Sequence, residues 1–284
     1  NEDTVAAEDS IPETIVADMA ERGFFSWSIP EEYGGLGLTT EELVLAAIEL
    51  SQCAVAYRAR VGTNTGIGSE AIIADGTEEQ KRRFLPRLAS GKATGCLALT
   101  EENAGSQASA IETSAVLDGS EYILNGAKRY ITNAPIADMF TVLARTDPDS
   151  SGSRGISAFL VERDTLGLST SAAYKMMGQS GSPVGEVYFD NCRVAKENLI
   201  GGQEGVGFQT TMKVLNKQRI HLAALCTGPA IRMLDMAMDH ASTRHQFGKP
   251  IIDFQLVGAL LADCQTEIQV AKSMVLETAR SRDE

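Results

Sequence analysis

The chain has 284 residues, of which 43% are apolar and 22% are charged, and its formal net charge is −13. This is the composition of a globular protein with a large core, and it excludes the collagen-like and disordered classes. The negative charge argues against nucleic acid or an anionic membrane as the main partner, because a polyanion would be repelled. We expect no signal peptide and no transmembrane helix, since no segment has about 18 uninterrupted apolar residues.

The cysteines and histidines show no pattern of a metal site or a disulfide framework. The five cysteines are widely spaced, and no CxxC pair occurs. His240 and His245 are five residues apart, which places them on different faces of a helix. We therefore expect free thiols and no bound metal. Free thiols fit a reducing compartment, so we expect a cytoplasmic protein, with the mitochondrial matrix as the alternative.

The first third of the chain has the apolar spacing of helices, and we predict an N-terminal α-helical domain over residues 1–94. A turn-rich loop covers residues 29–37. Thr39 or Thr40 is a suitable cap for the next helix, because a threonine oxygen accepts a hydrogen bond from a free N–H of the first turn. Thr77 begins the sequence of a capping box, with a glutamine three residues later.

From residue 95 to residue 200 the pattern changes to short apolar strands, and we predict a central β domain. Residues 114–124 have the sequence of a hairpin, and Asn125-Gly126 predicts a second turn after it. About six β segments follow one another without helices between them. That arrangement is typical of a small antiparallel sandwich or barrel.

Residues 201–284 return to a helical pattern, and we predict a C-terminal α-helical domain there. A glycine-rich segment leads into one long amphipathic run, and a second run follows Pro250, as in half of an antiparallel bundle. The chain stops inside a charged helical pattern, so we expect this domain to be truncated and residues to be missing from both ends. The predicted fold class is α+β, with N-terminal helices, a central antiparallel β domain and an incomplete C-terminal helical bundle.

Four short motifs occur in order along the chain, and each is weak alone. Together they resemble the acyl-CoA dehydrogenase family over nearly the whole chain. The motifs are Ile29-Pro30-Glu31-Glu32-Tyr33-Gly34-Gly35, Leu99-Thr100-Glu101-Glu102-Asn103-Ala104-Gly105-Ser106, Asn125-Gly126-x-Lys128-x-Tyr130-Ile131-Thr132-Asn133, and Arg244-x-x-Phe247-Gly248-x-Pro250 followed by Phe254-Gln255.

The resemblance implies an oxidoreductase that uses FAD to remove two hydrogens from the α and β carbons of an acyl-CoA, giving the 2-enoyl-CoA. It also implies an electron-transfer flavoprotein as electron acceptor and a homotetramer built as a dimer of dimers. An acyl-CoA oxidase or a flavin monooxygenase on the same fold is an alternative. A non-catalytic binding or scaffold homologue is an alternative of another class.

The resemblance also implies which residues hold the flavin. Thr100 contacts one edge of the ring through its backbone and hydroxyl, and Thr132 contacts the other edge. Tyr130 packs on the ring, and Leu99 supplies backbone near the pyrimidine side. Ser106 reaches a cofactor phosphate or the thioester arm. The plainer interpretation is that the threonines are ordinary strand residues and that Tyr130 belongs to the core.

A second set of implied flavin contacts lies near the C-terminal helices. By resemblance, Arg244 and Phe247 reach the adenine and pyrophosphate of a flavin bound mainly by a partner subunit, with Gln255 nearby. Arginine suits a diphosphate because its planar fork donates two hydrogen bonds at once. An arginine near a helix end also pairs simply with the last carbonyls of that helix.

The substrate contacts that the resemblance implies are Ser106, Ser182, Asn216 and Arg219. Ser182 matches a position that contacts the CoA arm, while Asn216 and Arg219 lie one turn apart on the helix that faces the acyl site. Their plainer interpretations are a turn serine and a solvated helix face. The family usually has an acidic residue near the position of Asn216.

By resemblance, we expect no catalytic base within residues 1–284. Most family members place a glutamate beyond the point that corresponds to Glu284. A minority place it one residue before the arginine matched by Arg219, where this chain has Gln218, which cannot accept a proton as a carboxylate does. Either the sequence ends before the base, or the protein is inactive as a dehydrogenase. Gln107 is a further departure, because the family signature has aspartate there.

Overall fold

The computed structural model describes residues 1–150 and 152–284, which form two compact units. The first unit consists of Asn1–Leu38 and Ala59–Gln218, and the second consists of Thr39–Arg58 and Arg219–Glu284. The order of helical, β and helical segments along the chain confirms the predicted α+β class. The predicted division at residues 94 and 200 stays a prediction, because the compact units follow other boundaries.

Helix α6 of the first unit begins at a cap that the sequence supplies. Thr77 accepts a hydrogen bond from Gln80 N–H at 3.2 Å, and the Gln80 side chain accepts one from Thr77 N–H at 3.0 Å, which confirms the capping box. Apolar side chains of this helix are buried against the sheet. The helices, including one short π-helical turn, are α1 Glu2–Glu8, α2 Glu13–Glu21, α4 Val55–Gly62 from Ala59 onward, η3 Thr63–Ile67, α5 Glu70–Asp75 and α6 Glu78–Ala89.

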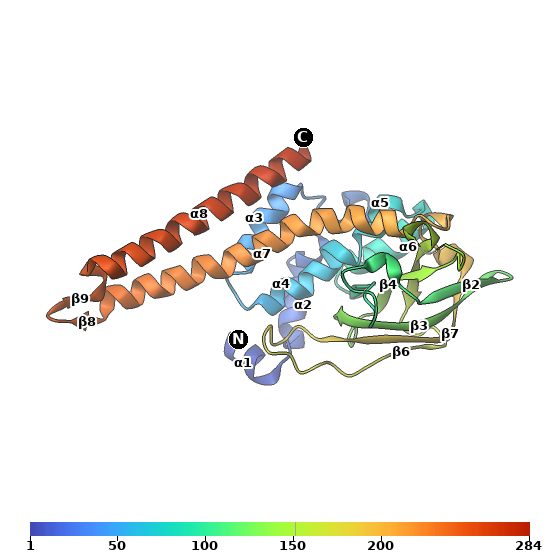
Figure 1. Ribbon diagram of the computed structural model, residues 1–284, viewed down its shortest axis with the longest axis horizontal. Coiled ribbons are helices and arrows are strands. Elements are labelled where there is room, and N and C mark those ends of the chain that lie inside the picture. Colours follow the sequence, from blue (N-terminus) through green and yellow to red (C-terminus); the bar gives the residue numbers. More distant parts are fainter. Residues whose placement is uncertain (151) are drawn as a thin grey trace. The chain divides into compact units, whose positions relative to one another are not determined.

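The central sheet has seven strands, and β3, β7 and β6 lie side by side in it (Figure 1). The strand order is β1-β4-β2-β3-β7-β6, with β5 paired to β4. The core of the sheet is apolar, and the rings of Tyr122 and Phe159 meet edge to face at 4.9 Å within it. The strands are β1 Gly95–Ala98, β2 Ser114–Asp118, β3 Glu121–Thr132, β4 Met139–Arg145, β5 Ile156–Glu162, β6 Leu168–Thr170 and β7 Val184–Ala195.

Two details of the predicted β domain were wrong. The sheet is mixed rather than purely antiparallel, because β1 runs parallel to β4. Asn125-Gly126 is not a turn but lies inside β3, where the pairing with β7 is irregular. The reason lies on the neighbouring strand. Asn191 of β7 is the extra residue of the bulge, and its N–H donates to the Asn125 side chain at 2.8 Å. Gly126 passes so close to Thr113 that a Cβ atom there would lie 2.5 Å from its hydroxyl.

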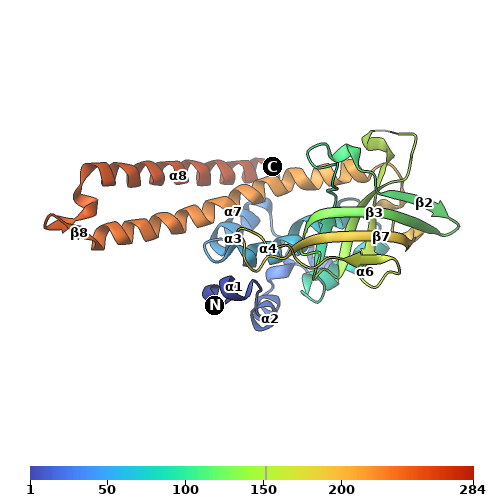
Figure 2. The ribbon, with the colours of Figure 1, turned by 60° about the horizontal axis from the view of Figure 1, so that its bottom comes forward.

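The second unit is helical, and Figure 2 shows its two long helices running back along each other. Thr39 caps α3, as the sequence predicts, and the Asp283 carboxylate accepts hydrogen bonds from the N–H groups of Thr40 and Glu41, both at 2.9 Å. Small and aliphatic side chains from the three helices share one core. The elements are α3 Thr40–Leu50, α7 Gly207–Thr243 from Arg219 onward, the strands β8 His245–Gln246 and β9 Lys249–Pro250, and α8 Gln255–Asp283.

Within residues 1–150 and 152–284, no helix is both long and apolar enough to cross a membrane. Over the same residues, no group of histidine, cysteine and carboxylate side chains has the arrangement of a metal site.

Candidate functional site

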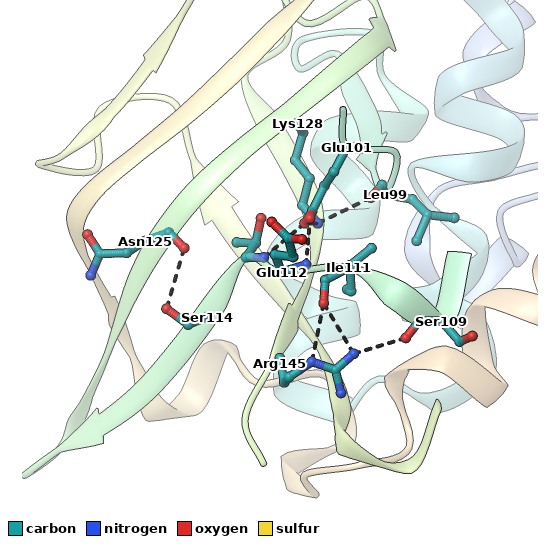
Figure 3. Close-up of polar contacts among 10 residues, drawn as sticks. Leu99, Glu101, Ser109, Ile111, Glu112, Ser114, Asn125, Lys128 and Arg145 are labelled. Carbon is teal, nitrogen blue, oxygen red and sulfur yellow. Dashed lines mark hydrogen bonds and ion pairs between the residues drawn. The ribbon is translucent and has the colours of Figure 1, made fainter. Parts of the chain in front are cut away.

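A buried ion pair joins the loop after β1 to the middle of β3 in the first unit. Lys128 Nζ lies 2.6 Å from Glu101 Oε1 and donates a second hydrogen bond to the carbonyl of Leu99 at 3.2 Å (Figure 3). The Lys128 side chain is fully buried, and that of Glu101 is 8% exposed. The pair therefore fixes the position of the Leu99–Glu101 segment on the sheet.

The Glu101 carboxylate is also held from the other side. It accepts hydrogen bonds from Glu112 N–H at 2.5 Å and from Thr113 N–H at 3.0 Å. Burial alone would raise the pKa of Glu101, but the Lys128 ammonium and these N–H groups lower it overall. Burial lowers the pKa of Lys128 to about 8, against the opposing effect of Glu101. The carboxylate thus carries a full charge that organises two loops.

Thr100 lies in the loop after β1, next to Glu101, and Thr132 is the last residue of β3. The N–H of Arg129 donates to the Thr100 carbonyl at 2.8 Å, which attaches the loop to β3, and Thr132 ends β3 opposite Val184. Both threonine side chains are half-buried. Neither hydroxyl forms a hydrogen bond within the part of the chain that the structure describes. These two hydroxyls, one in the loop after β1 and one at the end of β3, are available to a ligand.

Tyr130 lies on a bulge of β3, two residues before Thr132. The pairing with β7 advances three residues on β3, from Lys128 to Ile131, but only two on β7. Tyr130 has a φ of 56°, a left-handed conformation that costs a residue other than glycine about 1–3 kcal/mol. Its side chain is 63% exposed, and its ring centroid lies 5.6 Å from that of Tyr174. The plainer interpretation, that this tyrosine belongs to the core, is therefore excluded, and the ring presents a face outside the core.

A polar cluster supports the bulge from β7. Glu186 accepts hydrogen bonds from the hydroxyls of Tyr174 and Tyr188 and from Arg129 Nε at 3.2 Å. Burial and the bond to Glu186 raise the pKa of Tyr174 to about 12, and the two tyrosine hydroxyls lower the pKa of Glu186. Glu186 thus holds Tyr174, whose ring meets that of Tyr130, and Arg129, which precedes Tyr130 on β3.

Two further candidates of the first unit, Ser106 and Ser182, lie in loops. Ser106 is exposed in the loop before the short helical turn Ala108–Ala110. Arg145 holds the end of that loop, donating to the carbonyls of Ser109 at 2.9 Å and Ile111 at 3.1 Å (Figure 3). Ser182 is buried in the turn before β7, where its N–H donates to the Gln179 carbonyl at 3.0 Å.

The candidates on α7 differ in their surroundings. The side chains of Asn216 and Arg219 are exposed. Gln218 packs against the backbone of Gly66, where an added Cβ atom would lie 2.5 Å from Gln218 Oε1. Gln218, at the position that the resemblance names as a second place for the base, is therefore an amide in close contact with a neighbouring turn.

Arg244, Phe247 and Gln255 belong to the second unit, at and beside the β8–β9 hairpin. Arg244 N–H donates to the His240 carbonyl at 2.8 Å, as at the end of a helix. Phe247 has a φ of 51°, is 93% exposed and meets Phe254 edge to face at 6.2 Å. Gln255 opens α8 and is exposed.

Sequence reasoning missed the residues that position the site. Lys128 shares the inward side of β3 with Tyr122 and Leu124, so a lysine in that alternating pattern signals a buried acid partner. Glu101 is that partner, 27 residues away. No pattern in the sequence marked Glu186 or Arg145 as a positioning residue.

Sequence models of three domains match successive parts of the chain. They are described as the acyl-CoA dehydrogenase N-terminal domain, over residues 1–92, the middle domain, over 96–192, and the C-terminal domain, over 205–284. The chain belongs to the acyl-CoA dehydrogenase family. Members of this family are FAD-dependent oxidoreductases.

Individual acyl-CoA dehydrogenases and related proteins extend this result. The chain is 38% identical over 271 residues to an acyl-CoA dehydrogenase of Bacillus subtilis, covering 95% of this chain and 71% of the relative. It is 38% identical over 282 residues to a (2S)-methylsuccinyl-CoA dehydrogenase of Cereibacter sphaeroides, covering 96% and 51%. A solved chain described under an electron transferring flavoprotein of Acidaminococcus fermentans superimposes with a TM-score of 0.95 at 38% identity, covering 99% and 73%.

The acyl-CoA dehydrogenase cofactor fits the edge of β3 described above. An isoalloxazine ring is flat and apolar on its faces and has hydrogen-bonding atoms along its edges. Tyr130 offers an exposed aromatic face, and Thr100 and Thr132 offer hydroxyls without partners in the described residues. These are the groups that such a ring needs.

Proposed function

We propose that the chain binds FAD along β3 and catalyses the α,β-dehydrogenation of an acyl-CoA to the 2-enoyl-CoA. The observation that carries this proposal is the pair of Thr100 and Thr132 hydroxyls, which have no hydrogen-bond partner within the described residues, together with the exposed ring of Tyr130. The buried Lys128–Glu101 pair supports it, because that pair fixes Thr100 relative to β3.

Each of these residues has a separate task in the proposal. FAD, when bound, supplies the acceptor for the hydride that leaves the β carbon. The Thr100 and Thr132 groups donate hydrogen bonds toward the ring edges, where negative charge develops. The backbone of Leu99 borders the pyrimidine side, and Tyr130 excludes water from one face of the site.

The α proton needs a carboxylate that the described chain does not offer at the α7 position. Gln218 is an amide, and its contact with Gly66 gives it a packing role. We infer that the base lies outside residues 1–284. A desolvated glutamate suits the task, because burial raises its pKa toward that of the activated α proton.

The finer contacts are also proposals. We infer that Ser106 and Ser182 contact the CoA arm and that Asn216 and Arg219 border the acyl group. Acyl-CoA thioesters are the substrate class that the relatives named above support, and their names differ in the acyl group.

The proposed assembly and partners follow the same reasoning. We infer that Arg244, Phe247 and Gln255 contact a flavin held by a second copy, which requires an oligomer, proposed as a homotetramer. The exposed Phe247, on a strained hairpin, supports a contact made there between molecules. We further propose an electron-transfer flavoprotein as acceptor. The five free cysteines support a reducing compartment, either the cytoplasm or the mitochondrial matrix.

The proposal is tested by anaerobic titration of the flavin-loaded full-length protein, which would include the inferred base, with acyl-CoAs of different chain lengths. Loss of the oxidised flavin absorption with one of them, followed by slow reoxidation in air, is the expected result. Rapid peroxide formation would instead indicate an oxidase. A protein that binds flavin but keeps its oxidised spectrum with every thioester would contradict dehydrogenation, and one that binds neither would indicate a scaffold.

A further inference from the structure

The loop between β6 and β7, residues 171–183, is exposed in its middle and buried near its end. Residues 175–179 are all exposed, and the side chain of Met177 is fully so. Gly181 and Ser182, in contrast, are buried. Ser182 is the residue proposed above to contact the CoA arm, so whatever fixes this end of the loop also fixes that contact.

Both ends of the β6–β7 loop are attached to the sheet. Near its start, the Tyr174 hydroxyl donates to Glu186 of β7. At its last residue, the Pro183 carbonyl accepts a hydrogen bond from Asn133 N–H, directly after β3, at 2.7 Å. The stretch between these two attachments must be held by a contact of its own.

Asp9 supplies that contact. Gly181 N–H donates to the Asp9 carboxylate at 2.8 Å, although the two residues are 172 positions apart in the sequence. Within the described chain, no other hydrogen bond joins residues 175–182 to another segment. Figure 1 shows α1, which Asp9 follows, beside the loop. The N-terminal segment thus reaches the loop through one polar contact, next to Ser182.

The backbone at Asp9 is set for this contact. Asp9 ends α1, and the buried side chain of Val5 anchors that helix. Asp9 has a φ of 50° and a ψ of 33°, a left-handed conformation that glycine adopts freely and that asparagine and aspartate adopt more readily than other residues. The carboxylate is therefore presented by a fixed turn at the end of a helix.

The burial of Gly181 explains why the bond matters. A buried N–H without an acceptor is costly, so without Asp9 this part of the loop would shift toward water and take Ser182 with it. We propose that Asp9 is a positioning residue for the CoA arm of the substrate, acting through the end of the β6–β7 loop. This rests on the proposed dehydrogenation of an acyl-CoA and adds the N-terminal segment to substrate binding.

Two substitutions at Asp9 form a matched pair. Asp9→Asn and Asp9→Gly both remove the negative charge, and both new residues suit a left-handed backbone. Only the asparagine keeps a side-chain oxygen that accepts a hydrogen bond. Calorimetry on the flavin-loaded full-length protein gives the dissociation constant of CoA, and quenching of FAD fluorescence gives that of the cofactor.

The state of the loop is measured separately by limited digestion with trypsin. Lys175 is the only lysine or arginine in residues 171–183, and it lies in the exposed stretch. Mass spectrometry identifies the fragment that begins at Met176. The rate at which this fragment appears reports on release of the loop, whatever the loop binds.

The Asp9→Asn protein is expected to bind CoA within about twofold of the original, because the acceptor is kept. The Asp9→Gly protein should bind CoA about fivefold more weakly, which is the effect of losing one hydrogen bond, and should be cleaved after Lys175 about fivefold faster. FAD affinity should agree within about twofold in all three proteins, which a general loss of folding would not allow.

Three results would overturn the assignment: equal CoA affinity in the Asp9→Asn and Asp9→Gly proteins, unchanged cleavage after Lys175 in the Asp9→Gly protein, and a loss of FAD affinity as large as that of CoA affinity. Flavin bleaching by acyl-CoAs separates this assignment from the proposed function. Bleaching in a protein whose CoA affinity does not depend on Asp9 removes only the role of Asp9. CoA affinity that depends on Asp9, without bleaching by any thioester, removes the dehydrogenation and keeps Asp9 as a residue that positions a CoA site.

Discussion

Lys128 Nζ lies 2.6 Å from Glu101 Oε1, and the two charges are buried together beneath the loop that carries Thr100. Replacing the lysine by methionine would leave the carboxylate buried without a cation. We expect Lys128→Met to lower the free energy of unfolding by about 3–5 kcal/mol, as when one partner of a buried pair is removed. Urea unfolding followed by circular dichroism measures this change.

The double variant Lys128→Met/Glu101→Gln is the matched control for that experiment. A glutamine oxygen still accepts a hydrogen bond from Glu112 N–H or Thr113 N–H, and no net charge remains buried. We expect the double variant to recover much of the lost stability, giving a coupling energy of more than about 1 kcal/mol. A single variant as stable as the double one would show that the pair does not hold the loop.

The same pair predicts a pH dependence of stability. The pKa of Lys128 is lowered from 10.5 to about 8 by burial, so the folded chain releases this proton more readily than the unfolded chain. Between about pH 8 and 10.5 the unfolded state binds more protons at this site. The free energy of unfolding should therefore rise with pH there, by up to about 1.4 kcal/mol per pH unit.

This rise must be measured against the Lys128→Met/Glu101→Gln protein, because other groups titrate in the same range. Burial raises the pKa of Cys96 and of Cys192, so their unfolded-state ionisation lowers stability as pH increases, equally in both proteins. Urea unfolding at pH 7, 8, 9 and 9.5 gives the difference between the two proteins. A difference that is flat or falls above pH 8 would contradict the lowered pKa.

The unpartnered hydroxyls predict a separation of flavin binding from stability. Thr100→Val and Thr132→Val remove groups that bond to nothing in the described protein, so the flavin-free proteins should unfold within about 0.5 kcal/mol of the original. Each should bind FAD about five- to tenfold more weakly, which is the effect of losing one hydrogen bond. Quenching of FAD fluorescence measures the affinity.

A suitable control for the threonine variants is Thr141→Val on β4, whose hydroxyl is buried without a partner in the core. Its removal should leave FAD affinity unchanged and should not lower stability. Equal effects of Thr100→Val, Thr132→Val and Thr141→Val on flavin binding would show that the first two hydroxyls have no special position.

Local signals in the sequence predicted much of the fold for a physical reason. The capping box at Thr77 and the cap at Thr39 depend only on residues within one helical turn, and both are present. The hairpin over 114–124 likewise depends on its own turn and alternation. The turn predicted at Asn125-Gly126 was wrong, because a small, flexible pair of residues suits both a turn and a bulge. Pairing with the neighbouring strand β7 decides which of the two forms.

The candidate site was less accessible to sequence reasoning, because its supports are long-range. The family motifs named Thr100, Tyr130 and Thr132, but a motif does not reveal which side chain holds a loop in place. Lys128 and Glu101 are 27 residues apart, and Asp9 and Gly181 are 172 residues apart. Such pairings form only in the folded chain, and no local pattern specifies them.

The strained backbone at Tyr130 predicts opposite effects on stability and binding. Glycine adopts a φ of 56° without the penalty that tyrosine bears, although it loses more entropy on folding. We expect Tyr130→Gly to raise the free energy of unfolding of the flavin-free protein by about 1 kcal/mol while weakening FAD binding. Tyr130→Phe should change neither strongly, since it keeps the ring. Gln179→Gly, at a φ of 58° in the turn before β7, relieves similar strain without a predicted flavin contact, so it should gain stability and keep FAD affinity. If the Tyr130→Gly protein is less stable than the original or keeps full FAD affinity, then the backbone strain at the Tyr130 bulge is not retained for the cofactor.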